Sequence, residues 1–190
     1  MKIVFASHNH KKAEEIRSIL PKGYELLTLH DLLLKEEIPE EQPTIEGNSV
    51  FKARWVFERF GLPCFADDTG LEVRALNGEP GVHSARYAGP AKSDQANMDK
   101  LLAALNKQEN RSAQFKTVIT YIDAHTELQF TGIVSGQIAK EKLGTDGFGY
   151  DPIFYPENEQ RTFAQMSLSE KNNYSHRARA MSQFLAYLEA

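Results

Sequence analysis

Apolar residues recur along the chain with two periods, and segments of the two kinds alternate. Short apolar runs are typical of strands and are found at 2–7, 62–66 and 71–76. Apolar residues three and four positions apart predict helices over 11–20, 47–60, 94–105 and 175–190. Strands that alternate with amphipathic helices indicate the α/β fold class. The residues expected to face the core from these helices are Ala13, Ile16, Ile19, Leu20, Val50, Ala53, Phe57, Phe60, Met98, Leu101, Leu102, Leu105, Met181, Phe184, Leu185 and Leu188.

The period changes to two in the second half of the chain. Residues 114–122 and 127–138 alternate apolar and polar side chains on either side of a short polar segment, which predicts a β-hairpin. The strands of a hairpin run antiparallel, so we expect a mixed sheet rather than a purely parallel one. The glycine-rich segment 144–156 that follows is expected to be a loop.

Composition narrows the class of protein. With 190 residues, 41% hydrophobic and 25% charged, the chain is expected to form a single domain, 1–190, with a continuous core. A net charge of −4 argues against nucleic-acid binding, because duplex binders carry a large basic excess. The single cysteine, Cys64, excludes an intrachain disulfide and a multi-cysteine zinc site. The chain has neither a signal-peptide pattern nor an apolar run of about 18 residues, so we expect a cytoplasmic protein with no membrane partner.

Two predicted helices begin with cationic side chains, although a helix N-terminus itself carries a partial positive charge. For one such helix, basic side chains that face solvent are a sufficient explanation, because they destabilise the helix only slightly. Two of them favour anion sites, because unpaired backbone N–H groups and a nearby lysine suit a phosphate. The first start lacks the glycines of a Walker loop. The residues concerned are Asn9, His10, Lys11 and Lys12 at the first helix, and Lys171, Ser175, His176 and Arg177 at the last.

Two acidic pairs supply the opposite charge. Asp67 and Asp68 follow an apolar run, and Glu40 and Glu41 lie between prolines. Adjacent side chains of an extended segment point in opposite directions, so only one of the two aspartates can face a given ligand. Carboxylates with no neighbouring Cys or His suit Mg²⁺, which takes one or two carboxylates and leaves positions for phosphate oxygens. For the two aspartates alone, an ordinary turn at the end of a strand is an equally good interpretation.

The loop GFGYDPIF suits a nucleotide base. Glycines on both sides of Phe148 let the backbone approach a ligand closely, and an exposed ring stacks on a base for about 1–3 kcal/mol. Tyr150 and Asp151 can add polar contacts. The alternative is an Asp-Pro turn with Phe148 packed inward.

Six segments taken together resemble the inosine triphosphate pyrophosphatase family, whose members are also called XTP/dITP diphosphatases. The resemblance runs from residue 2 to 180 and is carried by SHNHKK, TIEGNSVFKA, FADDTGLEV, PGVHSARYAG, DGFGYDPIF and SEKNNYSHRARA. It implies an elongated mixed β-sheet flanked by helices, in two lobes with the active-site cleft between them. It also implies a Mg²⁺-dependent homodimer that hydrolyses ITP, dITP and XTP to the monophosphate and pyrophosphate.

The family's functional residues carry over position by position. Glu40 matches a metal-binding glutamate, with Glu41 as the alternative, and Asp68 matches the residue that is both metal ligand and general base. Thr69 matches a substrate contact, and Lys52 matches a phosphate-binding lysine. The phosphate-binding turn is matched by Ser7, His8, Asn9, His10, Lys11 and Lys12. The residues around the base are matched by Phe148, Gly149, Tyr150, Asp151, Lys171, His176 and Arg177.

These matches suggest in-line attack of water on the α-phosphorus. Asp68 would take or orient the proton, and Lys12 and Lys52 would stabilise the leaving pyrophosphate. Arginine and lysine only donate hydrogen bonds, so they favour a base with a 6-oxo group over adenine. Two alternatives stay open: a Maf-like pyrophosphatase for modified pyrimidine nucleotides, and a nucleotide-binding protein without turnover.

Overall fold

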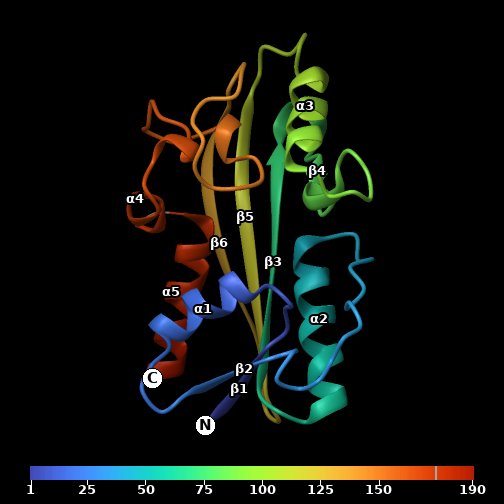
Figure 1. Ribbon diagram of the computed structural model, residues 1–190, viewed down its shortest axis with the longest axis vertical. Helices are drawn as coiled ribbons and strands as arrows, with labels where there is room; N and C mark the ends of the chain where they lie inside the picture. Colours follow the sequence, from blue (N-terminus) through green and yellow to red (C-terminus); the bar gives the residue numbers. More distant parts are fainter. Residues whose placement is uncertain (174) are drawn as a thin grey trace. The chain divides into compact units, whose positions relative to one another are not determined.

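The computed structural model describes residues 1–173 and 175–190, and for Lys11 and Glu15 it describes only the backbone. Its strands (Figure 1) are β1 (Lys2–Phe5), β2 (Glu25–Thr28), β3 (Cys64–Val73), β4 (Pro80–Gly81), β5 (Ser112–Ile122), β6 (Glu127–Ile138) and β7 (Phe154–Pro156). Its α-helices are α1 (His10–Ile19), α2 (Ile45–Phe60), α3 (Asp94–Ala104), α4 (Leu168–Asn172) and α5 (His176–Glu189). Short 3₁₀ turns occur at Arg74–Leu76, Ser84–Arg86, Asp151–Ile153 and Phe163–Gln165.

The strands form one mixed sheet with the order β2-β1-β3-β5-β6-β7, and β4 pairs with β3. Strand β1 is parallel to both β2 and β3, whereas β6 is antiparallel to β7. Strands β5 and β6 are neighbours joined by a short turn, as the predicted hairpin requires. The predicted fold class, a mixed sheet flanked by helices, is confirmed.

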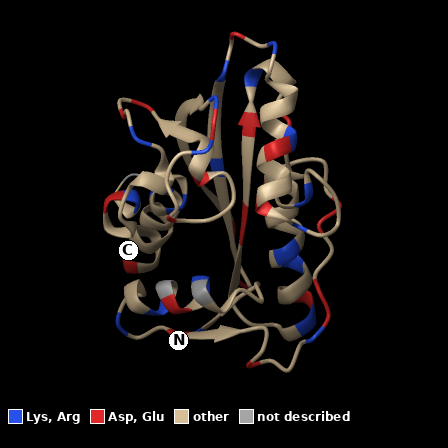
Figure 2. Ribbon diagram, turned by 45° about the horizontal axis from the view of Figure 1, so that its top comes forward, with Lys and Arg blue, Asp and Glu red and all other residues tan. Residues whose placement is uncertain are grey.

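Strand β3 differs from the prediction. The sequence places a strand end at Asp67 and Asp68, but a single strand, Cys64–Val73, runs through both aspartates (Figure 2). Both aspartates are ion-paired, with Lys12 and Lys52, so tertiary contacts override their poor strand propensity. The interpretation of this pair as a turn at a strand end is therefore wrong.

Other boundaries need smaller corrections. Helix α2 begins at Ile45, because the Thr44 side chain accepts a hydrogen bond from the backbone N–H of Gly47 and caps the helix. Ile19, expected in the core, is 49% exposed in the last turn of α1. Strand β2 was not predicted, since four residues at a sheet edge are too few to show a period. Ser175 caps α5 as expected, accepting from the N–H of Ala178.

The chain divides into two compact units, and β3, β5, β6 and α5 each pass from one into the other. The first unit comprises Met1–Asp68, Val118–Thr131 and Ala180–Ala190, and the second comprises Thr69–Thr117 and Gly132–Arg179. Among the described residues, no helix is both long and apolar enough to cross a membrane.

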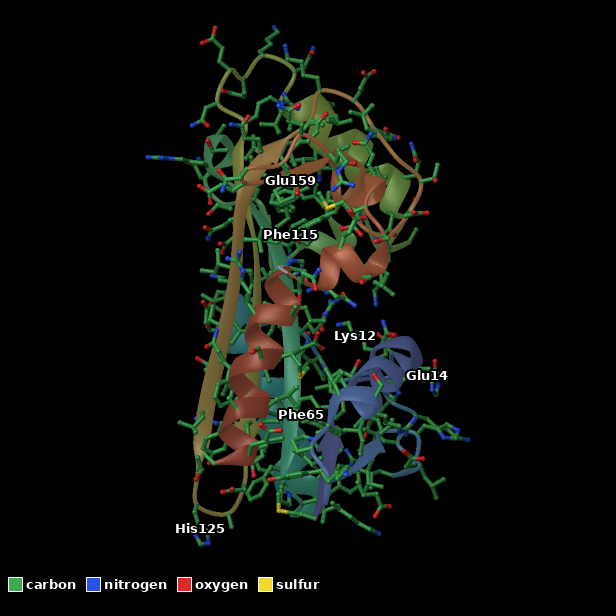
Figure 3. All side chains as sticks on the ribbon, turned by 90° about the vertical axis from the view of Figure 1, so that its left-hand side faces the viewer. Lys12, Glu14, Phe65, Phe115, His125 and Glu159 are labelled. Carbon is green, nitrogen blue, oxygen red and sulfur yellow. The ribbon has the colours of Figure 1, made fainter. Side chains whose placement is uncertain are left out.

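Helices cover both faces of the sheet in the first unit. Alternate residues of β1, such as Phe5 and Val4, enter two different cores. Phe5 and Phe65 pack with residues of α1 and α5, and Phe65 is labelled in Figure 3. Val4 and Cys64 pack with residues of α2. Strand segments buried on both faces read as continuous apolar runs, which is why 2–7 and 62–66 were recognisable in the sequence.

The second unit has a core on one face of its strands. Leu71, Val73 and Phe115 (Figure 3) pack there with Leu101 of α3 and with the segment that contains Phe163. Glu72, Gln114 and Lys116, which alternate with these residues in β3 and β5, are polar and only partly buried. This alternation is the period-two pattern that predicted the hairpin.

Candidate active site

The alternation of strand β3 sends Asp67 and Asp68 to opposite faces of the sheet. Asp67 lies on the α1 side, where its Oδ2 is 2.7 Å from Lys12 Nζ. Asp68 lies on the α2 side, where its Oδ1 is 2.8 Å from Lys52 Nζ. Both aspartates are buried. The expectation that the pair would point in two directions is confirmed.

Lys52 connects three acidic residues. Its ammonium donates to Glu40 Oε1, to Asp68 Oδ1 and to the main-chain oxygen of Asp67, each at 2.8 Å. The Lys52 side chain is 9% exposed and that of Glu40 is 36% exposed, so one side of the group can reach solvent. We call Lys52, Glu40, Asp67 and Asp68 the Lys52 cluster.

Polar contacts of helix α2 fix the position of Lys52. Ser49, one turn earlier, is fully buried, and its Oγ lies 3.1 Å from the carbonyl oxygens of both Ala66 and Val118. Its Oγ is also 2.8 Å from Thr120 Oγ1. These bonds hold α2 against β3 and β5, so the lysine at i+3 faces the aspartates. The apolar pattern predicts Val50 and Phe57 on the inner face, but both are only partly buried.

The loop with Glu40 is held by the same helix. The side-chain oxygen of Asn48, a buried residue, accepts a hydrogen bond from the backbone N–H of Gln42 at 3.0 Å. Glu40 is therefore the acidic residue of this loop that reaches Lys52, whereas Glu41 is exposed. Neither Asn48 nor Ser49 was singled out from the sequence, because small polar residues in a helix usually face solvent.

Burial and attraction between charges act against each other in this cluster, with opposite outcomes for Asp68 and Lys52. Desolvation raises the pKa of Asp68 to about 6, although the neighbouring Lys52 charge opposes the rise. Burial alone would lower the pKa of Lys52, but the attraction of Asp68, Glu40 and Asp67 outweighs it and raises this pKa above its ordinary value. Lys52 is therefore a persistent cation, and Asp68 is a carboxylate that can exchange a proton near neutral pH.

The cluster suits a hard divalent cation. Glu40 and Asp68 are carboxylates that both lie within 2.8 Å of one cationic atom. Among the described residues there is no group of three or more His, Cys, Asp or Glu side chains that could hold a metal ion. Mg²⁺ commonly takes only one or two carboxylates and completes its shell with water and phosphate oxygens, so the pair fits it.

The segment before α1 forms a compact turn. Ser7 Oγ accepts from the N–H of Asn9 at 3.2 Å, and Asn9 Oδ1 accepts from the N–H of Lys12 at 3.1 Å, which caps the helix. The His8 ring contacts the carbonyl oxygen of Glu36, and the exposed His10 ring meets that of His30 edge-on. The side chains of Ser7 and Asn9 thus already accept two backbone N–H groups at the start of the helix, and Lys12 is the lysine of this turn whose side chain the structure describes. The side chain of Lys11 lies outside the described residues.

In the second unit, Phe148 is exposed beside two cations. Its ring is 60% exposed, so the alternative with Phe148 packed inward is wrong. Lys171 Nζ lies 4.9 Å from the centre of this ring, and Arg177 Cζ lies 5.8 Å from it. Such distances are typical of cation–π contacts. We call Phe148, Asp151, Lys171 and Arg177 the Phe148 cluster.

The buried Asp151 holds the Phe148 cluster together through contacts with Lys171 and with the backbone of Phe148. The carboxylate is 2% exposed, and its Oδ2 is 2.5 Å from Lys171 Nζ and 2.9 Å from the backbone N of Phe148. Gly147 has a φ of +79°, and a Cβ there would lie 2.1 Å from this carboxylate, so the tight wrap requires glycine. The adjacent N–H of Gly149 donates to Asp94, which the sequence did not reveal because acidic residues are common in first helical turns.

Three other predicted site residues turn toward protein partners. The buried Tyr150 donates its hydroxyl to the carbonyl oxygen of Ser84, and burial raises the pKa of the phenol. The buried His176 ring stacks on Phe115, with centres 4.6 Å apart. Thr69 shares a 2.7 Å hydrogen bond with the hydroxyl of Thr117. Their side chains support the second unit.

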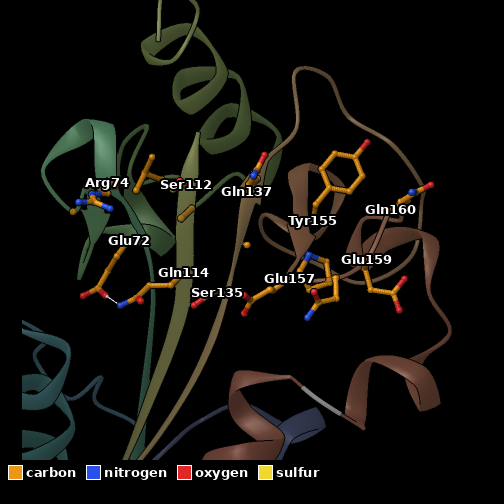
Figure 4. A pocket seen from close by; sticks show the side chains of 16 residues that line it. Glu72, Arg74, Ser112, Gln114, Ser135, Gln137, Tyr155, Glu157, Glu159 and Gln160 are labelled. Carbon is orange, nitrogen blue, oxygen red and sulfur yellow. Dashed lines mark hydrogen bonds between the residues drawn. The ribbon is translucent and has the colours of Figure 1, made fainter. Parts of the chain in front are cut away.

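A separate pocket of about 920 Å³ lies in the second unit, where polar residues of β3, β5 and β6 line it together with the segment after β7 (Figure 4). Glu72 and Gln114 are hydrogen-bonded at 2.7 Å in its wall. None of the predicted site residues lines this pocket. It is therefore distinct from both clusters.

The sequence of this chain is similar to those of known proteins. The family model described as the Ham1 family matches residues 3–187. This chain belongs to the Ham1 family. The dITP/XTP pyrophosphatase of Flavobacterium johnsoniae is 54% identical over 190 residues, which cover 100% of this chain and 99% of that protein. The dITP/XTP pyrophosphatase of Staphylococcus aureus strain MRSA252 is 44% identical over 98% of this chain and 95% of its own length.

Solved structures of Ham1 proteins agree with this membership. The Staphylococcus aureus Ham1 protein superposes with a TM-score of 0.95 at 42% identity, covering 100% of this chain and 98% of that one. The Coxiella burnetii HAM1 protein has a TM-score of 0.95 at 38% identity, with 100% of both chains covered. The resemblance stated from the sequence motifs is confirmed as family membership.

Proposed function

We propose that this protein is a nucleoside triphosphate pyrophosphatase that hydrolyses dITP, ITP and XTP to the monophosphate and pyrophosphate. Its Ham1-family relatives that are named dITP/XTP pyrophosphatase support this reaction, since they match the whole chain at 54% identity and below. The observation that carries the proposal is the Lys52 cluster, in which one buried cation meets two carboxylates at 2.8 Å. A cation among acidic groups of this kind suits a metal-bound polyphosphate.

The proposal assigns the triphosphate to Lys12 and the Lys52 cluster. Glu40 and Asp68 would hold Mg²⁺, which when bound neutralises phosphate charge and makes an attacking water more acidic. Lys12 and Lys52 would contact phosphate oxygens, Lys12 from the turn before α1 and Lys52 from α2. Before substrate binds, both lysines are ion-paired to aspartates of β3, Lys12 to Asp67 and Lys52 to Asp68.

The bond changes follow from these roles. A water oxygen attacks the α-phosphorus, and the bond from that phosphorus to the bridging oxygen breaks, so that pyrophosphate leaves with the bonding electrons. Asp68, whose pKa burial raises to about 6, accepts the proton of the water and passes it to solvent. Lys12 and Lys52 stabilise the charge that develops on the leaving pyrophosphate.

The proposal assigns the base to the Phe148 cluster. The exposed Phe148 ring offers a stacking face, and the Lys171 and Arg177 side chains beside it carry only hydrogen-bond donors. Donors pair with the 6-oxo group of hypoxanthine or xanthine and leave the 6-amino group of adenine without an acceptor. Since Tyr150 and His176 are buried in protein contacts, we assign them to supporting this surface. On the basis of the family resemblance, we further propose a homodimer of one domain, 1–190, acting in the cytoplasm.

A substrate panel tests the proposal. Initial rates with ITP, dITP, XTP, ATP, GTP, dTTP and UTP would be measured with separate detection of pyrophosphate and orthophosphate, with Mg²⁺ and with excess chelator. We expect release of pyrophosphate from ITP, dITP and XTP in the presence of Mg²⁺, and none when the chelator is in excess. Preference for modified pyrimidine nucleotides or dTTP would favour the Maf-like alternative. Binding of ITP without release of pyrophosphate would favour a protein without turnover.

A further inference from the structure

The ammonium group of Lys52 is surrounded by oxygen atoms of the kind that bind hard divalent cations. Its Nζ lies 2.8 Å from Glu40 Oε1, from Asp68 Oδ1 and from the main-chain oxygen of Asp67. An ammonium has three protons to donate, so three acceptors satisfy it. Carboxylate and carbonyl oxygens are also the preferred protein ligands of Mg²⁺ and related ions. One set of lone pairs therefore serves either cation.

The Lys52 ammonium and a divalent cation would repel each other if both were bound to these oxygens. The side chains of Lys52 and Asp68 are only 9% and 10% exposed, so little water screens their charges. A monovalent and a divalent cation a few ångströms apart repel each other strongly in such surroundings. Helix α2 is fixed by the bonds of Ser49 to Ala66 and Val118, whereas the lysine stem is a flexible chain of four carbons. The side chain can therefore swing without movement of the helix.

We propose that the Lys52 ammonium competes with the divalent cation for Glu40 and Asp68, so that binding of the cation displaces Lys52 and makes it available to phosphate oxygens. This inference rests on the metal site of the proposed function. It gives Lys52 two sets of partners in succession, first the carboxylates and then the triphosphate. It also makes Lys52 an obstacle to cation binding in the absence of nucleotide.

Cation binding to the full-length protein without nucleotide tests the competition. Mn²⁺ would be titrated while its unbound fraction is measured by electron paramagnetic resonance. We expect Lys52→Met to bind Mn²⁺ at least about tenfold more tightly than the wild type, because the competing ammonium is gone. Equal or weaker binding by this variant would overturn the inference.

Lys12→Met is the matched control. Lys12 also pairs with an aspartate of β3, at 2.7 Å, but this aspartate is Asp67, whose side chain is not one of the two proposed cation ligands. We expect its removal to change Mn²⁺ affinity by less than about threefold, since only a nearby charge is lost. Equal tightening in both variants would mean that net charge alone matters, which also overturns the inference.

A second measurement covers the case in which Lys52→Met does not fold. In the wild type, the ¹⁵N signals of the buried lysine ammonium groups would be followed during a Mg²⁺ titration, with Lys52→Arg and Lys171→Arg for assignment. The Lys52 signal is expected to shift while that of Lys171, held by Asp151, stays constant. An unchanged Lys52 signal at saturating Mg²⁺ contradicts competition. If no form of the protein binds Mn²⁺ or Mg²⁺, the proposed metal site itself fails, which distinguishes the two failures.

Discussion

Each of the two units buries a lysine beside a carboxylate, and the surroundings of the two lysines differ. The Lys52 ammonium donates three hydrogen bonds to oxygen atoms, two of which belong to carboxylates. Lys171 pairs with the carboxylate of Asp151 and lies over the rings of Phe148 and Phe163 at 4.9 and 5.3 Å. An all-oxygen setting suits exchange among cations and phosphates, whereas a setting of rings suits a flat base with a polar edge.

The two lysines are also positioned by different kinds of structure. Lys52 belongs to a sixteen-residue helix that hydrogen bonds attach to two strands. Lys171 belongs to a five-residue helix, and its partner Asp151 holds a loop by the N–H of Phe148. Groups that act on phosphorus need a backbone held in a fixed position, whereas stacking on a base tolerates a loop. The comparison therefore predicts different consequences for substitutions in each cluster.

The largest effect is expected in the Lys52 cluster. Asp68→Asn removes the proposed proton acceptor while an amide oxygen can still accept from Lys52, so release of pyrophosphate from ITP should fall about 10³-fold or more with the fold retained. Steady-state rates would measure the loss of activity, and thermal unfolding would show whether the fold is retained. Asp123→Asn, the same change in the β5–β6 turn of the first unit, should leave turnover unchanged. Full activity in Asp68→Asn would refute the assignment of the base.

The next effect concerns stability in the Phe148 cluster. Asp151→Ala leaves the buried Lys171 without its carboxylate, and breaking such a pair lowers the free energy of unfolding by about 3 kcal/mol or more. Chemical denaturation would measure this loss. Asp99→Ala, which breaks the more exposed pair with Lys142, should cost less than about 1 kcal/mol. Equal losses would show that Asp151 does not organise the loop.

Much of this arrangement follows from local patterns in the sequence. The alternation of side chains in an extended segment is enough to predict that Asp67 and Asp68 point apart, and the contacts with Lys12 and Lys52 agree. The helices were recognised because apolar residues such as Met181 and Phe184 recur at helical spacing. The cap at Ser175 was also predicted, whereas the cap at Thr44, which sets the start of α2, was not.

The remaining features depend on contacts between distant segments. The path of β3 through Asp67 and Asp68 could not be predicted, because lysines 55 and 16 residues away stabilise carboxylates in a strand. The buried polar face of α2, with Ser49 and Lys52, is invisible to a period that counts only apolar residues. The roles of Glu40 and Lys52 came from the family resemblance, and their proximity came from the structure.

A smaller effect is expected when the stacking surface is removed. Phe148→Ala should raise KM for ITP about tenfold or more with a much smaller change in kcat, because stacking on an aromatic side chain contributes about 1–3 kcal/mol per base. Ile133→Ala, which removes another exposed apolar side chain of the second unit, is the control. A fall in kcat with constant KM would place Phe148 in the chemistry rather than in base binding.

The smallest expected effect distinguishes recognition of the base from overall binding of the nucleotide. Arg177→Ala removes a donor beside the Phe148 ring, so the ratio of kcat/KM for ITP to that for ATP should fall about tenfold. Arg179→Ala is a matched control, since this arginine on the same helix donates instead to the carbonyl oxygen of Ile133. Because both variants lose one positive charge, a purely electrostatic effect would lower the rates for ITP and ATP together. An unchanged ratio in Arg177→Ala would leave Lys171 as the residue that distinguishes the bases, and the comparison of the two lysines would then extend from binding to specificity.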